Sequence, residues 1–315
     1  MIKTNVFSEN TDIDFSRGTV VTVGTFDGIH EGHKSLIEIL LQVSYKTNLI
    51  HVLVTFEPHP RRVLGKKDEV KVLTTLKEKL EILERYGIEN IMVINFTEEF
   101  SKISYEEFIK KYIIEKLNVK YFLIGHDHRF GKDREGDETK LLTLAKENNF
   151  SVIAVPPLVI NEETISSSLI RNLINRGELE IANAYLGRHF QFEGVVVEGS
   201  KRGRELGFPT INLKIADEKI IPFNGVYAVT CIVRGREYFG MMNVGTRPTF
   251  DNLPNKIIEI NLFDFTREIY GDTVLVTVYD FIRDEVHFTK KEDLIEQLYL
   301  DRSTIRNYLN IETTN

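Results

Sequence analysis

The first part of the chain, up to about residue 186, alternates short apolar runs with stretches of helical periodicity. Apolar runs typical of strands cover residues 19–24, 49–55, 90–95, 120–124 and 151–155. Between them, apolar residues recur at the spacing of amphipathic helices over residues 34–44, 75–86, 104–117 and 138–148. This alternation predicts βαβ units, and therefore an α/β fold in which helices cover both faces of a parallel sheet.

The pattern changes after residue 187, where strand-like runs follow one another with turn residues but no helix between them. These runs cover residues 189–198, 225–233, 236–244, 257–264 and 273–281. They predict an antiparallel barrel or sandwich of roughly six strands. A final helix is predicted over residues 291–309, and the side that packs on the strands carries Leu294, Ile295, Leu298, Ile305 and Leu309.

The change of pattern predicts two domains, residues 1–186 and 187–315. A chain of 315 residues is long enough for both. A helical stretch over residues 167–186 leads into the boundary, and the sequence contains no flexible linker there. We therefore expect two folded parts joined by a helical segment.

The composition, 42% apolar and 28% charged, is typical of a folded globular protein. The net charge of −7 argues against a protein that binds nucleic acid mainly through phosphate contacts, because such surfaces are usually basic. Anionic substrates must then be held by local donors or by a metal ion. We find no apolar run of membrane-spanning length and no apolar signal-peptide core. The single cysteine, Cys231, excludes an intrachain disulfide, so we expect a buried thiol and a cytoplasmic location.

The segment after the first predicted strand, residues 24–33, carries two histidines three positions apart at the start of a predicted helix. His30 and His33 leave the same face of that helix, whose N-terminus attracts phosphate. Gly28 and Gly32 let the backbone approach a ligand closely. The pattern favours nucleotidyl transfer, in which imidazoles and backbone amides stabilise charge on an α-phosphate. The alternative is a histidine pair that only caps or packs.

Three later segments also follow predicted strands and suit a nucleotide. Two prolines in residues 56–60 fix an extended loop that presents His59 near the same sheet edge, although such a segment alone is typical of a loop. Glycines, charges and an aromatic residue over 125–137 suit a polar ligand with a flat ring, the alternative being a solvated loop. Serines in residues 165–171 predict a helix cap, and Arg171 one turn later is placed to meet a phosphate. No Walker-type phosphate loop is present in the sequence.

The second half contains a glycine-rich basic stretch over residues 199–207, followed by a predicted strand. Its glycines are four residues apart and suit a loop that wraps its amides around phosphates. Thr210 and Asn212 follow, and positions two apart in a strand share a face. Two oxygen ligands together with ATP suit Mg²⁺. The alternative is a basic hairpin turn followed by an ordinary strand.

Further candidates lie in the strand-like runs that follow. Glu259, within residues 257–263, has the chemistry of a general base for a substrate hydroxyl, although a strand glutamate is more often exposed. Residues 243–250 predict a turn in which Arg247 is available for a ligand. His287 is interpreted as structural.

In this order along the chain, the segments resemble the family of prokaryotic bifunctional riboflavin kinase/FMN adenylyltransferases, also called FAD synthetases. The resemblance covers nearly the whole chain. It rests on G-x-F-D-G-x-H-x-G-H at 24–33, F-x-P-H-P at 56–60, R-F-G-x-x-R-x-G-D at 129–137, S-S-S-x-I-R at 166–171, G-R-x-L-G-F-P-T-x-N-L at 203–213 and N-x-G-T-R-P-T-F at 243–250. The chain departs from the usual pattern at Thr25, His128, Ser168 and Ile211, none of which removes a group with an assigned charge or ligand role.

The resemblance implies a Rossmann-like nucleotidyltransferase domain with a parallel sheet over residues 1–186. It also implies a six-stranded antiparallel β-barrel with a terminal helix over residues 187–315. The barrel would phosphorylate riboflavin to FMN with ATP and Mg²⁺. The first domain would join FMN to the AMP part of a second ATP, giving FAD and pyrophosphate. The implied partners are small molecules, without nucleic acid or membrane.

The resemblance also assigns roles to single residues. The catalytic residues would be Glu259 for the kinase and His30, His33 and Arg171 for adenylyl transfer. The ATP-binding residues would be Gly24, Phe26, Asp27, Gly32, Ser167, Ser168, Gly199, Gly203, Arg204 and Gly207. Flavin-binding residues would be His59, Asp127, Arg129, Phe130, Arg247, Asp301 and Arg306, and the Mg²⁺ ligands Thr210 and Asn212.

Two other functions remain open from the sequence. One is a flavin- or nucleotide-responsive binding protein built on a degenerate enzyme scaffold, which would bind flavin tightly without turnover. The other is a cytidylyltransferase fused to an unrelated barrel, which would use CTP in place of ATP. The intact His30, His33, Thr210, Asn212 and Glu259 weigh against a binding protein.

Overall fold

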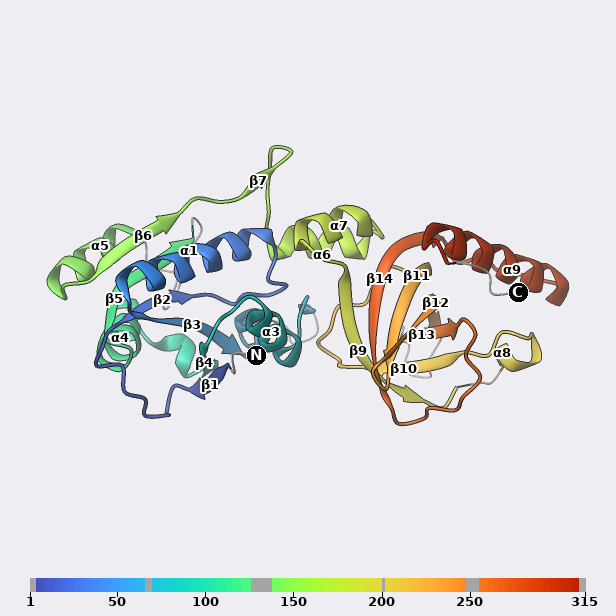
Figure 1. Cartoon of the computed structure of the whole chain (residues 1–315), viewed down its shortest axis with the longest axis horizontal. Helices are drawn as coiled ribbons and strands as arrows, with labels where there is room; N and C mark the ends of the chain where they lie inside the picture. Colours follow the sequence, from blue (N-terminus) through green and yellow to red (C-terminus); the bar gives the residue numbers. More distant parts are fainter. Residues whose placement is uncertain (1–3, 66–69, 126–137, 200–201, 248–254, 312–315) are drawn as a thin grey trace. The chain divides into compact units, whose positions relative to one another are not determined.

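The computed structural model describes residues 4–65, 70–125, 138–199, 202–247 and 255–311 (Figure 1). The chain forms two compact units, Met1–Ser167 and Ser168–Asn315, which are described one at a time. The predicted domain boundary between residues 186 and 187 stays a prediction, because compact packing alone does not define an independently folding domain.

The first unit contains a parallel sheet of six strands in the order β1-β4-β3-β2-β5-β6 (Figure 1). The strands are β1 (Asn5–Ser8), β2 (Thr19–Val23), β3 (Ile50–Glu57), β4 (Asn90–Asn95), β5 (Val119–Gly125) and β6 (Ser151–Val155). The prediction of a parallel sheet is confirmed. All five residues of β2 are buried, which is expected when helices cover both faces of a parallel sheet.

Helices cover the two faces because successive strand residues point to opposite sides. Val20 and Leu53 pack with α1 (Glu31–Thr47) and α3 (Leu76–Arg85). Their strand neighbours Val21 and Val52 pack with the opposite layer. That layer consists of α4 (Tyr105–Phe108), the π-helical segment η2 (Ile109–Lys116) and α5 (Glu138–Glu147). Shorter elements are α2 (Pro60–Leu64), η1 (Phe100–Lys102), β7 (Val159–Ile160) and β8 (Glu163–Thr164).

The strand order reverses between β2 and β5, which lie side by side in the sheet. From β2 the chain moves outward to β3 and β4, and then returns to β5 and β6 on the other side. In open α/β sheets, ligands bind at the carboxyl ends of the strands beside such a reversal. The loop after β2, residues 24–30, lies at this point, whereas residues 126–137 after β5 lie outside the described part of the chain.

The second unit begins at Ser168, within α6 (Ser167–Asn175), continues through α7 (Leu179–Leu186) and then forms a closed antiparallel barrel (Figure 1). The barrel strands follow the order β10-β13-β12-β11-β14-β9. They are β9 (Phe190–Val197), β10 (Ile211–Ile215), β11 (Gly225–Val233), β12 (Arg236–Arg247), β13 (Asn255–Leu262) and β14 (Thr273–Arg283). The helices α8 (Arg202–Glu205) and α9 (Lys291–Tyr308) complete the unit. Because the strands form a closed barrel, the second unit is not the sandwich that the sequence pattern also allowed.

Alternate barrel residues form two separate apolar layers. Ile258 and Ile260 of β13 are buried, as is Cys231 of β11, and burial raises the pKa of that thiol. On the outside, Ile305 of α9 packs in a cluster with Phe208, Ala228, Met241 and Phe263. Leu298 and Leu309 also pack there, as predicted for the apolar side of this helix.

Candidate active sites

The loop between β2 and α1 holds two non-glycine residues in the left-handed backbone region. Phe26 has φ 47° and Ile29 has φ 40°. Such conformations cost of the order of 1–3 kcal/mol each and persist only where the surroundings impose them. Left-handed residues of this kind concentrate at functional sites, so the loop that carries the histidine pair is itself a candidate site.

The loop is held by hydrogen bonds from the segment before α3. The Asp27 carboxylate, only 1% exposed, accepts from the backbone amides of Leu73 at 2.9 Å and Thr74 at 3.0 Å. The Thr74 hydroxyl in turn accepts from the Gly28 amide at 3.0 Å. Asp27 therefore supports the loop from within, and its predicted part in ATP binding stays a prediction.

The two histidines lie together at the first turn of α1. Their rings stack with centroids 3.7 Å apart and planes 19° from parallel, and the Phe26 ring lies 5.1 Å from that of His33. His30 is the N-cap of α1, and its Nδ1 accepts from the His33 amide at 3.3 Å. The cap occupies only one ring nitrogen of His30, so capping and a role on phosphate are compatible. The same stretch contains the other predicted ATP-binding residues Gly24 and Gly32.

One serine of residues 165–171 forms a hydrogen bond with the loop between β2 and α1. The Ser167 hydroxyl donates to the Asp27 carbonyl oxygen at 2.9 Å, within the first unit. Ser168 and Arg171 belong to the second unit, where the Arg171 guanidinium donates to the Ser168 hydroxyl at 3.5 Å. Ser167 is thereby brought to the histidine loop.

The flavin candidates of the first half are only partly described. His59 caps α2, because its Nδ1 accepts from the Arg61 amide at 3.2 Å, and it is 7% exposed. Asp127, Arg129 and Phe130 lie outside the described residues. Their predicted roles stay predictions.

The kinase candidates converge through the register of the barrel strands. Glu259 on β13 lies directly opposite Asn212 on β10 and, on its other side, opposite Asn243 on β12. Directly opposite residues of antiparallel strands have Cβ atoms roughly 4.5–5.5 Å apart and share a face. The neighbours Ile258 and Ile260 are buried, so half-buried Glu259 lies on the opposite, outer face. A carboxylate between two amides therefore lies on the outside of the barrel.

The glycine-rich stretch lies directly on the predicted metal ligands. A Cβ at Gly199 would overlap the Asn212 amide, and one at Gly203 would overlap the Phe208 carbonyl oxygen. The Gly203 Cβ position lies 3.3 Å from the Thr210 hydroxyl, just before β10 begins. Glycine permits this close packing, which brings the loop, Thr210, Asn212 and Glu259 into one neighbourhood.

The predicted flavin residues of the last helix form ion pairs with the barrel. Asp301 is 2% exposed, and the Arg283 guanidinium donates to both of its carboxylate oxygens at 2.8 and 2.7 Å. Arg306 pairs with Asp264 at 2.7 Å and lies over the Phe263 ring. These contacts fix α9 on the barrel. The Arg247 side chain lies outside the described residues.

Replacing Asp301 with alanine is expected to lower the unfolding free energy of the second unit by about 1.5–3 kcal/mol, because the partly exposed Arg283 guanidinium loses its charged hydrogen-bond partner. Chemical denaturation of the chain measures this loss. Glu296→Ala, an exposed position on the same helix, serves as the control and leaves stability unchanged. Equal stability of Asp301→Ala and the control would contradict the structural role.

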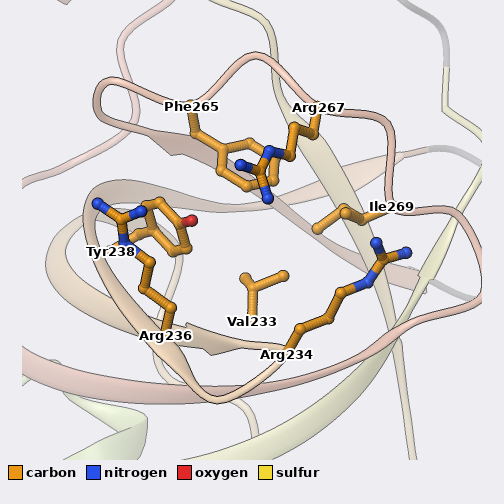
Figure 2. Close-up of a pocket in the computed structure, with 7 residues that line it drawn as sticks. All are labelled: Val233, Arg234, Arg236, Tyr238, Phe265, Arg267 and Ile269. Atoms are coloured by element: carbon orange, nitrogen blue, oxygen red, sulfur yellow. The ribbon is translucent and has the colours of Figure 1, made fainter.

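A small basic pocket lies at the barrel end where β11 turns into β12 (Figure 2). Figure 2 shows the Arg236 guanidinium against the Tyr238 ring and the Arg267 guanidinium beside Phe265. Glu268, which lies in sequence between the lining residues Arg267 and Ile269, pairs with Arg204 of the glycine-rich stretch at 2.6 Å. The volume of about 210 Å³ is below the roughly 300–1,000 Å³ of small-molecule sites, so the pocket does not enclose a whole nucleotide.

Two further features concern the described residues as a whole. No group of three or more His, Cys, Asp or Glu side chains among them is arranged to hold a metal ion. In the same part of the chain, no helix combines the length and apolar character needed to cross a membrane.

Sequence reasoning missed Lys79, although the helical pattern contained a signal. Lys79 is 3% exposed and donates to the Thr55 hydroxyl at 3.2 Å. It lies three and four positions before the buried Ile82 and Leu83, and therefore on the apolar face of α3. A lysine on an apolar face indicates a buried charge with a specific partner.

Comparison with known proteins gives a consistent result. Residues 12–169 match the family model described as FAD synthetase, and residues 186–309 match the one described as riboflavin kinase. The chain is 38% identical over 298 residues to the bifunctional riboflavin kinase/FMN adenylyltransferase of Buchnera aphidicola subsp. Schizaphis graminum, covering 93% of this chain and 95% of that protein. The protein of the same name from Bacillus subtilis is 37% identical over 297 residues, covering 93% of each.

A solved structure is also similar over most of the chain. It is a crystal structure described as a macrolide-efflux protein from Streptococcus pneumoniae, with a TM-score of 0.85 and 34% identity. The likeness covers 92% of this chain and 94% of that one. The two family models and the named relatives agree on one pair of activities.

Proposed function

The chain belongs to the family of bifunctional riboflavin kinase/FMN adenylyltransferases, and from this we propose which residues carry each reaction. The C-terminal part phosphorylates riboflavin to FMN and the N-terminal part adenylylates FMN to FAD, both with ATP. The observation that carries the residue assignment is the strand register that aligns Glu259 with Asn212 beside the glycine-rich stretch.

In the kinase reaction, Glu259 accepts the proton of the riboflavin 5′-hydroxyl as that oxygen attacks the γ-phosphorus of ATP. The bond from the γ-phosphorus to its bridging oxygen breaks, and ADP leaves. Amides of the stretch around Gly199, Gly203 and Gly207, together with Arg204, hold the phosphates. The half-buried position of Glu259 on the outer barrel face supports this role.

Thr210 and Asn212 are the proposed Mg²⁺ ligands. A hydroxyl and an amide oxygen are hard donors of the kind that Mg²⁺ accepts alongside phosphate and water. Their position against Gly199 and Gly203 supports the fit. When bound, Mg²⁺ would neutralise charge on the phosphates of ATP.

In adenylyl transfer, a phosphate oxygen of FMN attacks the α-phosphorus of ATP and pyrophosphate leaves. His30 and His33 stabilise the negative charge that develops on the α-phosphate, helped by the N-terminus of α1. Ser167, Ser168 and Arg171 bind the triphosphate. The stacked pair at the start of α1, after the loop that follows β2 beside the reversal of strand order, supports this assignment.

The flavin side of each site is proposed from the remaining candidates. His59, Asp127, Arg129 and Phe130 face FMN in the first reaction site, and Arg247, Asp301 and Arg306 act on the riboflavin side of the barrel. Asp301 and Arg306 are proposed to act on the riboflavin side through the ion pairs that hold α9 on the barrel. The net charge of −7 supports small-molecule partners without nucleic acid, and we propose a cytoplasmic location.

Replacing Gly199 with alanine tests the metal assignment without removing a ligand. The new Cβ displaces the Asn212 amide, which can rotate, so the fold survives. The Mg²⁺ concentration for half-maximal riboflavin kinase activity is expected to rise roughly 10- to 100-fold, as for other residues that orient metal ligands. FMN adenylylation stays unchanged.

The matched comparison for Gly199→Ala is Asn212→Ala, which removes the proposed ligand itself. The double variant is expected to be no more impaired than Asn212→Ala, because both changes act on one group. A Gly199→Ala chain with the parent's Mg²⁺ dependence would show that Asn212 is not a ligand.

A further inference from the structure

Lys79 is a buried charge that neither proposed site uses. Its relative exposure is 3%, although lysine is almost never buried to this degree without a partner. Its ammonium nitrogen donates to the hydroxyl of Thr55 in β3 at 3.2 Å. Burial lowers the pKa of Lys79, while the negative charges of Asp27 and Glu57 raise it in part. The lysine is thus kept in the interior beneath the loop that ends at His30.

The Thr55 hydroxyl extends this contact to the loop. A protonated lysine offers only N–H donors, so the Thr55 oxygen accepts from Lys79 and uses its own hydrogen elsewhere. That hydrogen goes to the carbonyl oxygen of Thr25, 3.1 Å away. Thr55 is fully buried, so water does not compete for either bond. The charge of Lys79 therefore sets the direction of the hydrogen bond that holds Thr25.

The segment just before Lys79 holds the loop on the C-terminal side of Phe26, the residue with a left-handed backbone. Thr25 directly precedes Phe26, and Asp27 directly follows it. Asp27 is held by backbone amides of residues 73 and 74, a few positions before Lys79. Phe26 is fixed from both sides, so loss of one support changes the path of the loop into α1.

We propose that Lys79 is a positioning residue for adenylyl transfer. Through Thr55 it holds residues 24–30, and with them His30 and His33, in the arrangement that acts on the α-phosphate of ATP. The inference rests on the proposed roles of the two histidines.

The test compares Lys79→Met and Thr55→Val with the parent chain in FMN adenylylation, started from supplied FMN and ATP. Methionine keeps the length of the side chain without its charge, and valine keeps the shape of threonine without its hydroxyl. We expect kcat to fall roughly 10- to 100-fold in each, because a misplacement of about 1 Å at reacting groups costs this much. The KM for ATP changes little. Thr55→Ser, which retains the hydroxyl, restores the parent's kcat.

Four measurements separate positioning from a general loss of structure. The kcat of the double variant falls no further than that of the more impaired single variant, because both residues belong to one chain of contacts. Lys77→Met, at an exposed lysine of α3 that pairs with Glu81, keeps the parent's kcat. Lys79→Met retains a cooperative thermal unfolding transition above the assay temperature, which shows that the chain is folded when its kcat is measured. The riboflavin kinase rate of each sample is also unchanged.

His33→Ala is measured alongside to separate the two proposals. A parent-like kcat for Lys79→Met with an inactive His33→Ala would overturn the role of Lys79 alone. Multiplicative losses in the Lys79→Met/Thr55→Val double variant would likewise overturn the connection through Thr55. An active His33→Ala would overturn the assignment of the histidine pair, and with it this proposal.

Discussion

Replacing His33 with alanine is expected to slow FMN adenylylation by roughly two to three orders of magnitude, the loss found when a fixed donor to developing charge is removed. His33 lies in the first turn of α1, with its ring stacked on that of His30 at 3.7 Å. No covalent intermediate is required, so stabilisation of charge on the α-phosphate is the main contribution available to these rings. The effect is measured as the rate of FAD formation from supplied FMN and ATP, with FAD quantified by chromatography.

The His33→Ala chain carries its own control, because riboflavin phosphorylation uses residues of the other unit. That rate is expected to equal the parent's. Glu38→Ala, at an exposed position of α1, controls for changes in the helix and retains full adenylylation. Loss of both activities in His33→Ala would argue against separate sites.

Replacing Glu259 with glutamine is expected to slow riboflavin phosphorylation by about 10²- to 10⁴-fold, the contribution of a positioned general base. Glutamine keeps the size and hydrogen bonding of the side chain but does not take a proton from the riboflavin hydroxyl. The neighbouring Asn212 and Asn243 retain their places on β10 and β12. FMN produced from riboflavin and ATP measures the loss.

Glu237→Gln provides the comparison for Glu259→Gln. Glu237 is an exposed glutamate of β12 in the same barrel, and its replacement is expected to leave both rates unchanged. Glu259→Gln itself is expected to adenylylate supplied FMN at the parent's rate. A kinase rate within twofold of the parent's would exclude Glu259 as the base.

Hydrophobic periodicity accounts for most of the first unit, and its failures have physical reasons. The runs that predicted β2 to β5 are apolar because helices cover both sides of the sheet there. β1 gave no such signal, since only Phe7 of its four residues is buried. The stretch 104–117 reads as one helix, but the structure divides it into α4 and the π-helical η2. That difference lies in the hydrogen-bond register, which side-chain periodicity does not report.

Some candidate-site residues could be predicted from spacing within a short segment, whereas others depend on contacts between distant segments. The histidine pair and the glycine-rich stretch are local, so spacing alone identified them as candidates. The alignment of Asn212, Glu259 and Asn243 depends on how three strands pair when the barrel closes. Lys79 depends on a contact with Thr55, 24 residues earlier in the chain. Such contacts follow from the complete fold and leave only weak traces in sequence.

The central claim is that each half of the chain carries one reaction at its own site. The most direct measurement incubates riboflavin, ATP and Mg²⁺ with His33→Ala, with Glu259→Gln, and with an equimolar mixture of the two. We predict that His33→Ala accumulates FMN, that Glu259→Gln leaves riboflavin largely unconverted, and that the mixture produces FAD. A mixture that forms no FAD, although each variant is folded and FMN accumulates, would contradict the claim.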